Sequence, residues 1–388
     1  MLRGEQIICI SSVDWDYENW MRHHQIMSRL AKYNQVLYVE SSISILSPFK
    51  YPVRWRKWIK WAKGIRKVGE NLYVYSPPIV LPFSHKSLWI NRFNQKILLK
   101  SLLKIVRRAR LNNPILWLYT PFGSSYIGKF NEKLACYDCA DEITAFAGAT
   151  ELVGELERDL LQKVNIVFTS ATRLYENKKK INPNTYLVTN AGEAEHYSRV
   201  LSGKCKIPND IADIKHPIIG FFGGISDWID LDLLEYIARI RPQWSFFMIG
   251  PIMTNISQLQ RLSNVRFVGL KSYEQLPDYV KIYDVCIIPF KINKLTASVN
   301  PVKLYEYLAA GKPVVSTALP EVEKFRDVID IAKNKEDFLS CLTHIIEQGS
   351  RTDNEIKKRV KIALENSWDS RVESISKTVW LALDKKGS

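Results

Sequence analysis

Short apolar runs recur along this chain at the spacing expected for the strands of a parallel sheet. In the first half they lie at Gln6–Ser12, Gln35–Glu40, Asn71–Tyr75, Pro114–Thr120, Leu134–Asp138, Ile166–Ser170 and Thr185–Asn190. The runs are apolar throughout, and helical patterns such as Trp20–Lys32, Leu88–Arg110, Glu151–Gln162 and Thr172–Lys180 separate them. Strands that are buried on both faces and alternate with helices are typical of a doubly wound parallel sheet.

The second half repeats this rhythm after a hydrophilic stretch, Ser198–His216, which we interpret as a linker. Its expected strands are Pro217–Phe222, Trp244–Ile249, Val265–Val268, Asp284–Phe290, Pro313–Thr317 and Val328–Ile331. The 388 residues therefore predict an α/β chain with two Rossmann-like domains, 1–200 and 201–367. A C-terminal helix at about 368–384 is expected to pack back on the first domain. Because ligands of such sheets bind beyond the carboxyl ends of the strands, we expect the site in a cleft where the two sheets face each other.

The composition places the chain among globular proteins, with 46% apolar and 24% charged residues. No run of about 18 apolar residues exists, so no membrane-spanning helix is expected. The N-terminal apolar run Ile7–Ile10 is too short for a signal peptide, and six scattered cysteines suit a reducing compartment. The sequence therefore predicts a cytoplasmic protein.

The positive charge is concentrated in the first half of the chain. The whole chain has a formal net charge of +15. Residues 1–200 contain 29 Lys and Arg against 17 Asp and Glu, which leaves +12 for that half. Such an asymmetry predicts a polyanionic or membrane partner for the first domain.

One basic segment, RWRKWIKWAKGIRK at Arg54–Lys67, sharpens this expectation. On a helix, its apolar face would be built around Trp55 and Trp58, and its basic face around Lys57, Lys60 and Lys63. A basic amphipathic helix with tryptophan on its apolar face is typical of the membrane interface. Two alternatives stay open, a helix packed on its own domain and a nucleic-acid contact, although no nucleic-acid recognition motif accompanies the charge.

The segment NPVKLYEYLAAGKPVVST, at Asn300–Thr317, carries the most chemistry. Asn300 suits an N-cap, Pro301 the first helical position, and Gly311 the end of the helix. Lys303 and Glu306 are three residues apart and share one face. Free N–H groups, a cation and a carboxylate at one helix end fit a diphosphate and a ribose diol. An ordinary capped helix with a solvent-exposed Lys303–Glu306 pair is the alternative.

This segment resembles the nucleotide-sugar signature of GT-B glycosyltransferases, especially the family 4-like group, also called group 1. The order of GFFGGISDW, FFMIGP and NVRFVGLKSYEQLPDYVKIYDVCIIPF before it resembles the same family. In the first half, SSVDWDYENWMRHHQIMSRLAKYNQVLYVE and CYDCADEITAF resemble the bacterial cell-envelope branch that includes teichuronic acid glycosyltransferases. The resemblance covers nearly the whole chain and implies two Rossmann-like domains that face each other across a cleft.

The resemblance also implies site residues, with two departures. Glu306 matches the family glutamate that holds the donor ribose. Ser298 stands where relatives often have a second glutamate, and the loop at Gly223 lacks the usual Arg and Lys, so Lys303 is the candidate for the diphosphate, with Lys291 and Lys294 as weaker ones. The predicted donor-binding set is Gly223, Gly224, Gly250, Asn300, Pro301, Val302, Lys303 and Glu306.

Sugar transfer with inversion needs a base near the acceptor hydroxyl. Asp138 and Asp141, after the strand Leu134–Tyr137, are the predicted catalytic residues, and turn or N-cap roles are their alternative. Asp14, Arg22 and His23 surround the first strand–helix connection and are candidates for contact with the acceptor or the diphosphate.

No metal or cofactor is predicted. Cys136 and Cys139 form a CxxC without a second pair at zinc spacing, and buried strand cysteines explain it. Asp14-Trp15-Asp16 and Asp230-Leu231-Asp232 imitate the metal-binding DxD of GT-A enzymes, whereas GT-B transfer usually needs no bound metal.

These observations predict a hexosyl- or other glycosyltransferase, peripheral on the inner face of a bacterial membrane. Its donor would be a nucleotide-diphosphate sugar, with UDP or GDP as the nucleotide. Its acceptor would be a lipid-linked or growing cell-envelope polysaccharide, and its further partner an anionic membrane surface. A nucleotide-sugar epimerase of the UDP-N-acetylglucosamine 2-epimerase type shares the architecture and is one alternative. A basic nucleic-acid-binding protein is the other.

Overall fold

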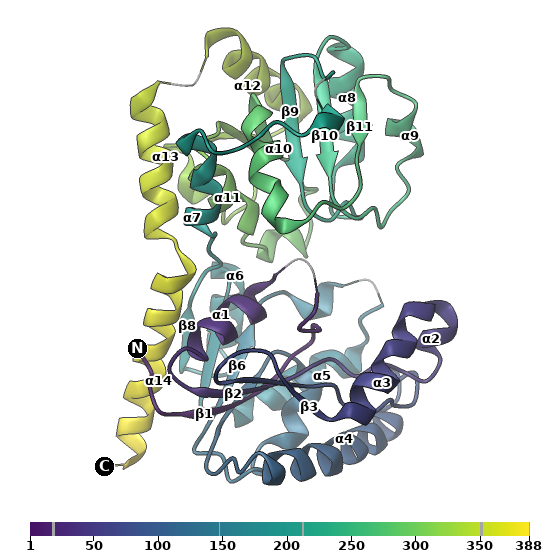
Figure 1. Ribbon diagram of the computed structural model, residues 1–388, viewed down its shortest axis with the longest axis vertical. Helices are drawn as coiled ribbons and strands as arrows, with labels where there is room; N and C mark the ends of the chain where they lie inside the picture. Colours follow the sequence, from purple (N-terminus) through teal and green to yellow (C-terminus); the bar gives the residue numbers. More distant parts are fainter. Residues whose placement is uncertain (18–19, 147, 212, 350–351, 388) are drawn as a thin grey trace. The chain divides into compact units, whose positions relative to one another are not determined.

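Two sheets of mainly parallel strands form the frame of the chain (Figure 1). They are seen in a computed structural model that describes residues 1–17, 20–146, 148–211, 213–349 and 352–387. The contacts divide the chain into unit 1, residues 1–189 with 371–388, and unit 2, residues 190–370. Both sheets and their covering helices make this an α/β protein with two Rossmann-like units, as the apolar runs predict.

The sheet of unit 1 has the order β3-β4-β2-β1-β5-β6-β7-β8. Its strands are β1 Gln6–Ile10, β2 Gln35–Val39, β3 Ile65–Lys67, β4 Leu72–Tyr75, β5 Ile115–Leu118, β6 Leu134–Cys139, β7 Ile166–Thr169 and β8 Thr185–Leu187. All neighbours pair in parallel except β3, which runs antiparallel to β4. The centre of the sheet is fully apolar, with Ile8 of β1 opposite Leu37 and Leu116.

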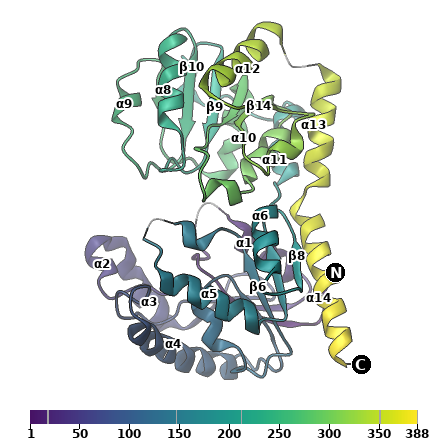
Figure 2. The ribbon, with the colours of Figure 1, turned by 180° about the vertical axis from the view of Figure 1, so that it is seen from behind.

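The helices of unit 1 follow the strands. They are α1 Arg22–Leu30, α2 Ser47–Lys50, α3 Arg56–Lys63, α4 Leu88–Arg108, α5 Glu151–Lys163 and α6 Thr172–Lys179, with short 3-10 turns η1 Pro52–Trp55, η2 Pro121–Tyr126 and η3 Ile143–Ala145. Figures 1 and 2 both place α2, α3 and α4 together at one end of the unit. The last helix, α14 Trp368–Gly387, belongs to unit 1 from Arg371 onward, and its Ser376 contacts Met1.

Unit 2 has a sheet of order β11-β10-β9-β12-β13-β14, parallel throughout. Its strands are β9 Ile218–Phe222, β10 Ser245–Ile249, β11 Val265–Phe267, β12 Val285–Ile288, β13 Val314–Thr317 and β14 Asp330–Ala332. The helices are α7 Ala194–Ser198, α8 Leu231–Ile240, α9 Ser257–Gln260, α10 Leu276–Ile282, α11 Val302–Ala309, α12 Lys335–Gln348 and α13 Asp353–Glu365, with 3-10 turns η4 Arg199–Ser202, η5 Asn209–Ile211, η6 Tyr273–Gln275, η7 Thr296–Ser298 and η8 Glu323–Phe325.

Two sequence expectations about organisation need correction. The chain divides at Thr189, ahead of the predicted linker Ser198–His216, and that stretch contributes the buried Cys205 and Ile211 to unit 2. The helix expected at Arg54–Lys67 ends at Lys63, because Gly64 adopts a positive φ and the chain returns as β3. Among the described residues, no helix is both long enough and apolar enough to cross a membrane.

Candidate active site

In unit 2, the candidate donor site is organised around the start of α11. The helix begins at Val302 with Pro301 as N-cap, one residue later than the sequence predicts. Asn300 therefore does not cap the helix. Its buried side chain accepts a hydrogen bond from Tyr305 Oη at 3.1 Å and donates one to Glu321 at 3.4 Å. Asn300 thus fixes the loop that leads into the helix.

Two glycines allow three segments to meet at the carboxyl ends of β9 and β10. Gly223 has a φ of 132° and Gly250 a φ of 140°. A Cβ on Gly250 would lie 2.0 Å from the Gly223 carbonyl oxygen, and one on Gly223 would lie 2.5 Å from Lys303 Nζ. Only glycine fits both positions. Gly224, which follows, is also crowded, since its Cβ would lie 2.9 Å from the Met253 methyl group.

Lys303 and Glu306 lie together on α11 without forming a salt bridge. In the described part of the chain no ion pair joins them, and the ammonium lies 5.3 Å from the Phe221 ring centroid and 5.6 Å from that of Phe290. The Glu306 side chain is only 8% exposed. Burial raises the pKa of Glu306 to about 7, against the opposing effect of Lys303, and burial lowers the pKa of Lys303. The solvent-exposed Lys303–Glu306 pair expected of an ordinary capped helix is therefore not seen in the described structure. A ligand with anionic and hydroxyl groups would give both desolvated side chains a polar partner.

Ser298 lies just before this helix. It is fully buried, and its Oγ has no hydrogen-bond partner. Buried hydroxyls usually have a partner, so this one marks the approach to α11 as a place where a ligand group or water would bind. Lys291 and Lys294, the weaker diphosphate candidates, are exposed.

In unit 1, the structure separates the two predicted catalytic aspartates. Asp138 lies within β6 and does not follow the strand as a catalytic loop residue would, and it is 0% exposed. Its Oδ1 accepts a hydrogen bond from Arg22 Nε at 2.8 Å, and burial raises its pKa against the effect of Arg22. Asp141, three residues on, is exposed beyond the end of β6. The geometry thus argues against Asp138 as a base and keeps Asp141 as the candidate.

The first strand–helix connection holds the other candidates. Arg22 is buried and also donates to the Val188 carbonyl at 2.8 Å, so it ties α1 to the chain after β8. His23 is buried too, and its Nε2 lies 3.1 Å from the Oγ of the exposed Ser12. Burial lowers the pKa of His23 to about 3, so the imidazole is neutral near pH 7. Asp14 is half-buried and accepts a hydrogen bond from Ser41 at 2.9 Å.

Helix α3 turns its apolar face to the outside and part of its basic face toward its own unit. Trp55, Trp58 and Ile59 are 46%, 37% and 57% exposed, although they form the apolar face. Lys57, predicted for the outer basic face, is buried, because its ammonium pairs with Asp14 and Glu40. Lys60 pairs with Asp16 at 2.6 Å, and only Lys63 of the three predicted interface lysines is exposed without an ion pair in the described chain.

Residues 216–348 match the family model described as glycosyl transferases group 1. These residues form a group 1 glycosyltransferase domain. The domain contains Gly223, Gly250, Lys303 and Glu306, whereas Asp138 and Asp141 lie outside the matched segment.

Further comparisons reach beyond this matched segment. A Bacillus subtilis strain 168 protein named as teichuronic acid biosynthesis glycosyltransferase TuaH is 29% identical over 282 residues, which cover 68% of this chain and 70% of that protein. A solved structure of sucrose-phosphate synthase from Thermosynechococcus elongatus superposes with a TM-score of 0.73 at 12% identity, covering 98% of this chain and 100% of that one. The fold is therefore the GT-B fold, and family match and fold together make the chain a glycosyltransferase.

Two further structures with this fold hold nucleotides. Anabaena HepE, in complex with UDP and glucose, has a TM-score of 0.67 at 12% identity, covering 97% of this chain and 99% of that one. A trehalose-6-phosphate protein from E. coli, bound with UDP-2-fluoro glucose, has a TM-score of 0.68 at 11% identity, covering 96% and 99%.

Sequence reasoning missed one group of residues in this glycosyltransferase. A cavity in unit 1 is lined by side chains of α4 and of the loops after β1 and β2, among them Ser12, Ser41, Asn94 and Gln95. Helical periodicity marks Asn94 and Gln95 only as neighbours of the apolar Leu98, and no motif accompanies them.

Proposed function

We propose that this glycosyltransferase moves a sugar from a nucleotide-diphosphate sugar to a lipid-linked or growing cell-envelope glycan at the inner face of the membrane. One observation carries the donor half. Lys303 and Glu306 are desolvated side by side at the start of α11, without a salt bridge between them, where Gly223 and Gly250 let the backbone approach closely. A diphosphate would pair with Lys303 and the helix N–H groups, and a ribose diol would donate to Glu306.

The nucleotides of related folds support this donor. HepE and the E. coli protein are bound with UDP and a UDP-sugar respectively, so a UDP-sugar is the first donor to test. The acceptor class rests on the relative named for teichuronic acid biosynthesis, which is a cell-envelope polymer pathway by its name. No metal or cofactor is part of the proposal.

The membrane surface is supported by the outward face of α3. Phe49, Trp55 and Trp58 form a chain of ring contacts, with centroids 5.6 Å and 6.0 Å apart. We call these three residues with Ile59 and Trp61 the aromatic patch, and all five are exposed. Exposed tryptophans beside basic residues suit the interface of an anionic bilayer, where each Lys or Arg contributes about 1 kcal/mol.

Asp141 is the proposed base. It is exposed beyond β6, at the edge of the sheet where parallel strands present their carboxyl ends. A carboxylate there would accept the proton of the acceptor hydroxyl while the donor bond breaks.

The test is a donor screen that measures nucleoside diphosphate release, with a bacterial membrane extract as the source of acceptor. Extract-dependent release from one nucleotide sugar, absent in Lys303→Ala, is the expected result. Interconversion of UDP-N-acetylglucosamine without any acceptor would instead establish the epimerase alternative. No release and no transfer from any UDP- or GDP-sugar would overturn the proposal.

A further inference from the structure

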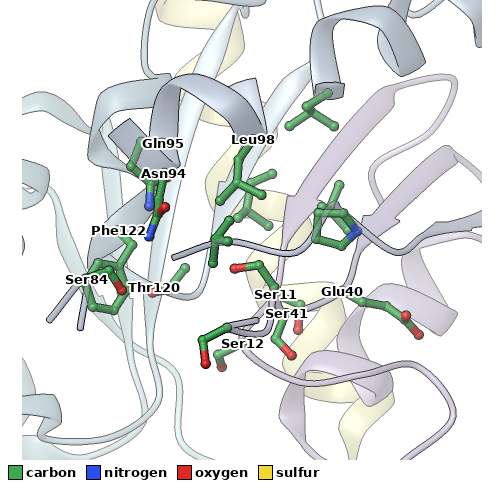
Figure 3. A pocket seen from close by; sticks show the side chains of 18 of the residues that line it. Ser11, Ser12, Glu40, Ser41, Ser84, Asn94, Gln95, Leu98, Thr120 and Phe122 are labelled. Atoms are coloured by element: carbon green, nitrogen blue, oxygen red, sulfur yellow. The ribbon is translucent and has the colours of Figure 1, made fainter. Parts of the chain in front are cut away.

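A cavity of about 400 Å³ opens within unit 1, beside α4 (Figure 3). It is lined by the chain after β1, the chain after β2, the loop 77–85 and one side of α4. In Figure 3, Asn94 and Gln95 lie on one side of the cavity, whereas Ser11, Ser12 and Ser41 lie on another. Because β1 and β6 are parallel strands on either side of β5, the cavity lies at the edge of the sheet that also presents Asp141.

The lining of this cavity combines apolar side chains with many hydroxyl groups. Leu98 and Leu102 of α4, with Val80, form apolar wall, and all three are buried. The hydroxyl groups are those of Ser11, Ser12, Ser41, Ser42, Ser44, Ser84 and Thr120. A cavity of this size and mixture is typical of a site for a small molecule or for one unit of a larger one.

The charges of the lining exclude a diphosphate as its occupant. Among the described lining residues, Glu40 is the only Asp, Glu, Lys or Arg. Its carboxylate is already held by Arg66 at 3.0 Å and Lys57 at 3.4 Å. Phosphate groups are recognised by cations or clustered N–H groups, and no lysine or arginine of the described lining faces this space.

Gln95 supplies the observation that points to a polar ligand. Its side chain is 8% exposed, and its buried Oε1 has no hydrogen-bond partner in the described structure. In its neighbour Asn94, both polar atoms of the side chain have partners. The amide oxygen accepts a hydrogen bond from Leu81 N at 3.0 Å, and the amide nitrogen donates one to Leu81 O at 2.9 Å. Asn94 thus fixes the loop that forms the cavity wall, and Gln95 is left with an acceptor that a ligand hydroxyl would satisfy.

We propose that this cavity binds one neutral sugar of the acceptor, with a sugar hydroxyl donating to Gln95 Oε1. The apolar face of the ring would rest on Leu98 and Leu102, and the serines would bind its other hydroxyls. A hydrocarbon chain fits less well, because it would leave Gln95 and the lining hydroxyls unpaired. This inference rests on the proposed function for the identity of the acceptor.

The direct test uses methyl glycosides of hexoses and N-acetylhexosamines as probes, with binding followed by saturation-transfer NMR. Gln95→Leu should reduce the affinity for the bound glycoside about three- to tenfold, the usual effect of losing one hydrogen bond. Asn91→Leu is the matched control. Asn91 is a buried amide one turn earlier on α4, also with an unpartnered polar atom, and it does not line the cavity.

Kinetics separate this inference from the proposed function. With the membrane extract as acceptor, Gln95→Leu should raise the apparent acceptor KM and leave the donor KM unchanged, and Asn91→Leu should change neither. Leu98→Phe narrows the cavity without removing a polar group, and it should also raise the apparent acceptor KM. This variant keeps the test available if Gln95→Leu fails to fold.

Normal acceptor KM and glycoside binding in Gln95→Leu and Leu98→Phe, with transfer intact, would overturn the cavity assignment alone. Equal losses in Gln95→Leu and Asn91→Leu would likewise overturn it, because they indicate a change in α4. Absence of transfer with glycoside binding still dependent on Gln95 would overturn the proposed function and leave the cavity a sugar site.

Discussion

At the scale of single residues, burial changes the chemistry that the sequence suggests. The three-residue spacing of Lys303 and Glu306 was enough to place both on one face of a helix. It could not show that both are desolvated, because burial depends on residues outside the helix, such as Phe221 of β9 and Phe290 just after β12, whose rings lie beside the Lys303 ammonium. Their burial makes Glu306 a group that titrates close to neutral pH.

Donor affinity should therefore depend on pH through Glu306. Its pKa is about 7 in the folded chain, so the carboxylate that we propose as the acceptor of ribose hydroxyls becomes ionised between pH 6 and 8. Affinity for a UDP-sugar, whose phosphates do not titrate in this range, should rise about tenfold over that interval. Calorimetry at both pH values measures it, and Glu306→Gln should bind more weakly with a flat profile.

Stability gives an independent reading of the same group. A carboxyl whose folded pKa is raised binds more protons in the folded state than in the unfolded state. Its ionisation therefore lowers the free energy of unfolding as pH rises from 4.5 through about 7. Glu306→Gln should lose less stability over that window than the parent chain. If Glu306→Gln keeps the pH profile of the parent chain in both donor affinity and stability, Glu306 is not the titrating group.

The two aspartates of unit 1 show the limit of local reasoning. Both follow an apolar run in the sequence, and nothing local distinguishes them. The partner that separates them is Arg22, which lies 116 residues from Asp138 and binds its carboxylate. A long-range ion pair of this kind leaves no trace in the neighbouring sequence.

Asparagine variants should separate their roles. Asp141→Asn should lower kcat by about 10²–10⁴ with little change in thermal stability, as expected for loss of a base. Asp138→Asn should instead lower the free energy of unfolding by roughly 3–5 kcal/mol, because Arg22 would be left as an uncompensated buried charge. Denaturant unfolding and single-turnover rates measure the two effects. Full activity in Asp141→Asn would place the base elsewhere in unit 1, with His23 as the next candidate.

At the scale of elements, α3 shows that an amphipathic pattern predicts two faces but not which face turns inward. The tryptophans were expected to contact either a membrane or the domain. The ion pairs decide this, since Lys57 and Lys60 contact Asp14, Asp16 and Glu40 and leave the tryptophans outside. Arg66 lies in β3 and also pairs with Asp16 and Glu40.

Lys57 should therefore matter for stability far more than Lys63. Lys57→Met removes a buried cation from between two carboxylates and should lower the free energy of unfolding by roughly 3 kcal/mol. Lys63→Met, at an exposed position of the same helix, should stay within about 0.5 kcal/mol of the parent. Urea unfolding provides both numbers. Similar values for the two variants would mean that the lysine face of α3 is solvated.

At the scale of the whole molecule, the fold was predictable because its signal repeats. Each predicted strand is present in the structure within a few residues, since parallel strands buried on both faces need continuous apolar runs. Among the described residues the missed strand is β3, Ile65–Lys67, an antiparallel edge strand with one apolar residue. The division into units fell at Thr189, because a hydrophilic segment with a few buried anchors does not behave as a linker.

The proposed membrane binding would depend on the whole chain, because its net charge and its aromatic patch would act together. The double variant Trp55→Ser, Trp58→Ser should weaken binding to neutral and anionic vesicles alike, since it removes the inserted apolar area. Replacing Arg56, Lys63 and Lys67 with Gln should reduce only the preference for anionic vesicles and the loss of binding in salt. These three are exposed, whereas Lys57 and Lys60 are held in ion pairs and are left unchanged.

Co-sedimentation with vesicles of neutral or anionic lipid, at low and high salt, measures these effects. The matched control is Trp380→Ser, which removes an exposed tryptophan of α14, outside the aromatic patch. That variant should bind vesicles like the parent chain. Transfer to a soluble acceptor should survive in every variant, because Lys303 and Glu306 lie in unit 2 and are unchanged. If the parent ignores anionic vesicles, or if Trp380→Ser binds as weakly as the double variant, the aromatic patch serves another partner and the membrane assignment fails.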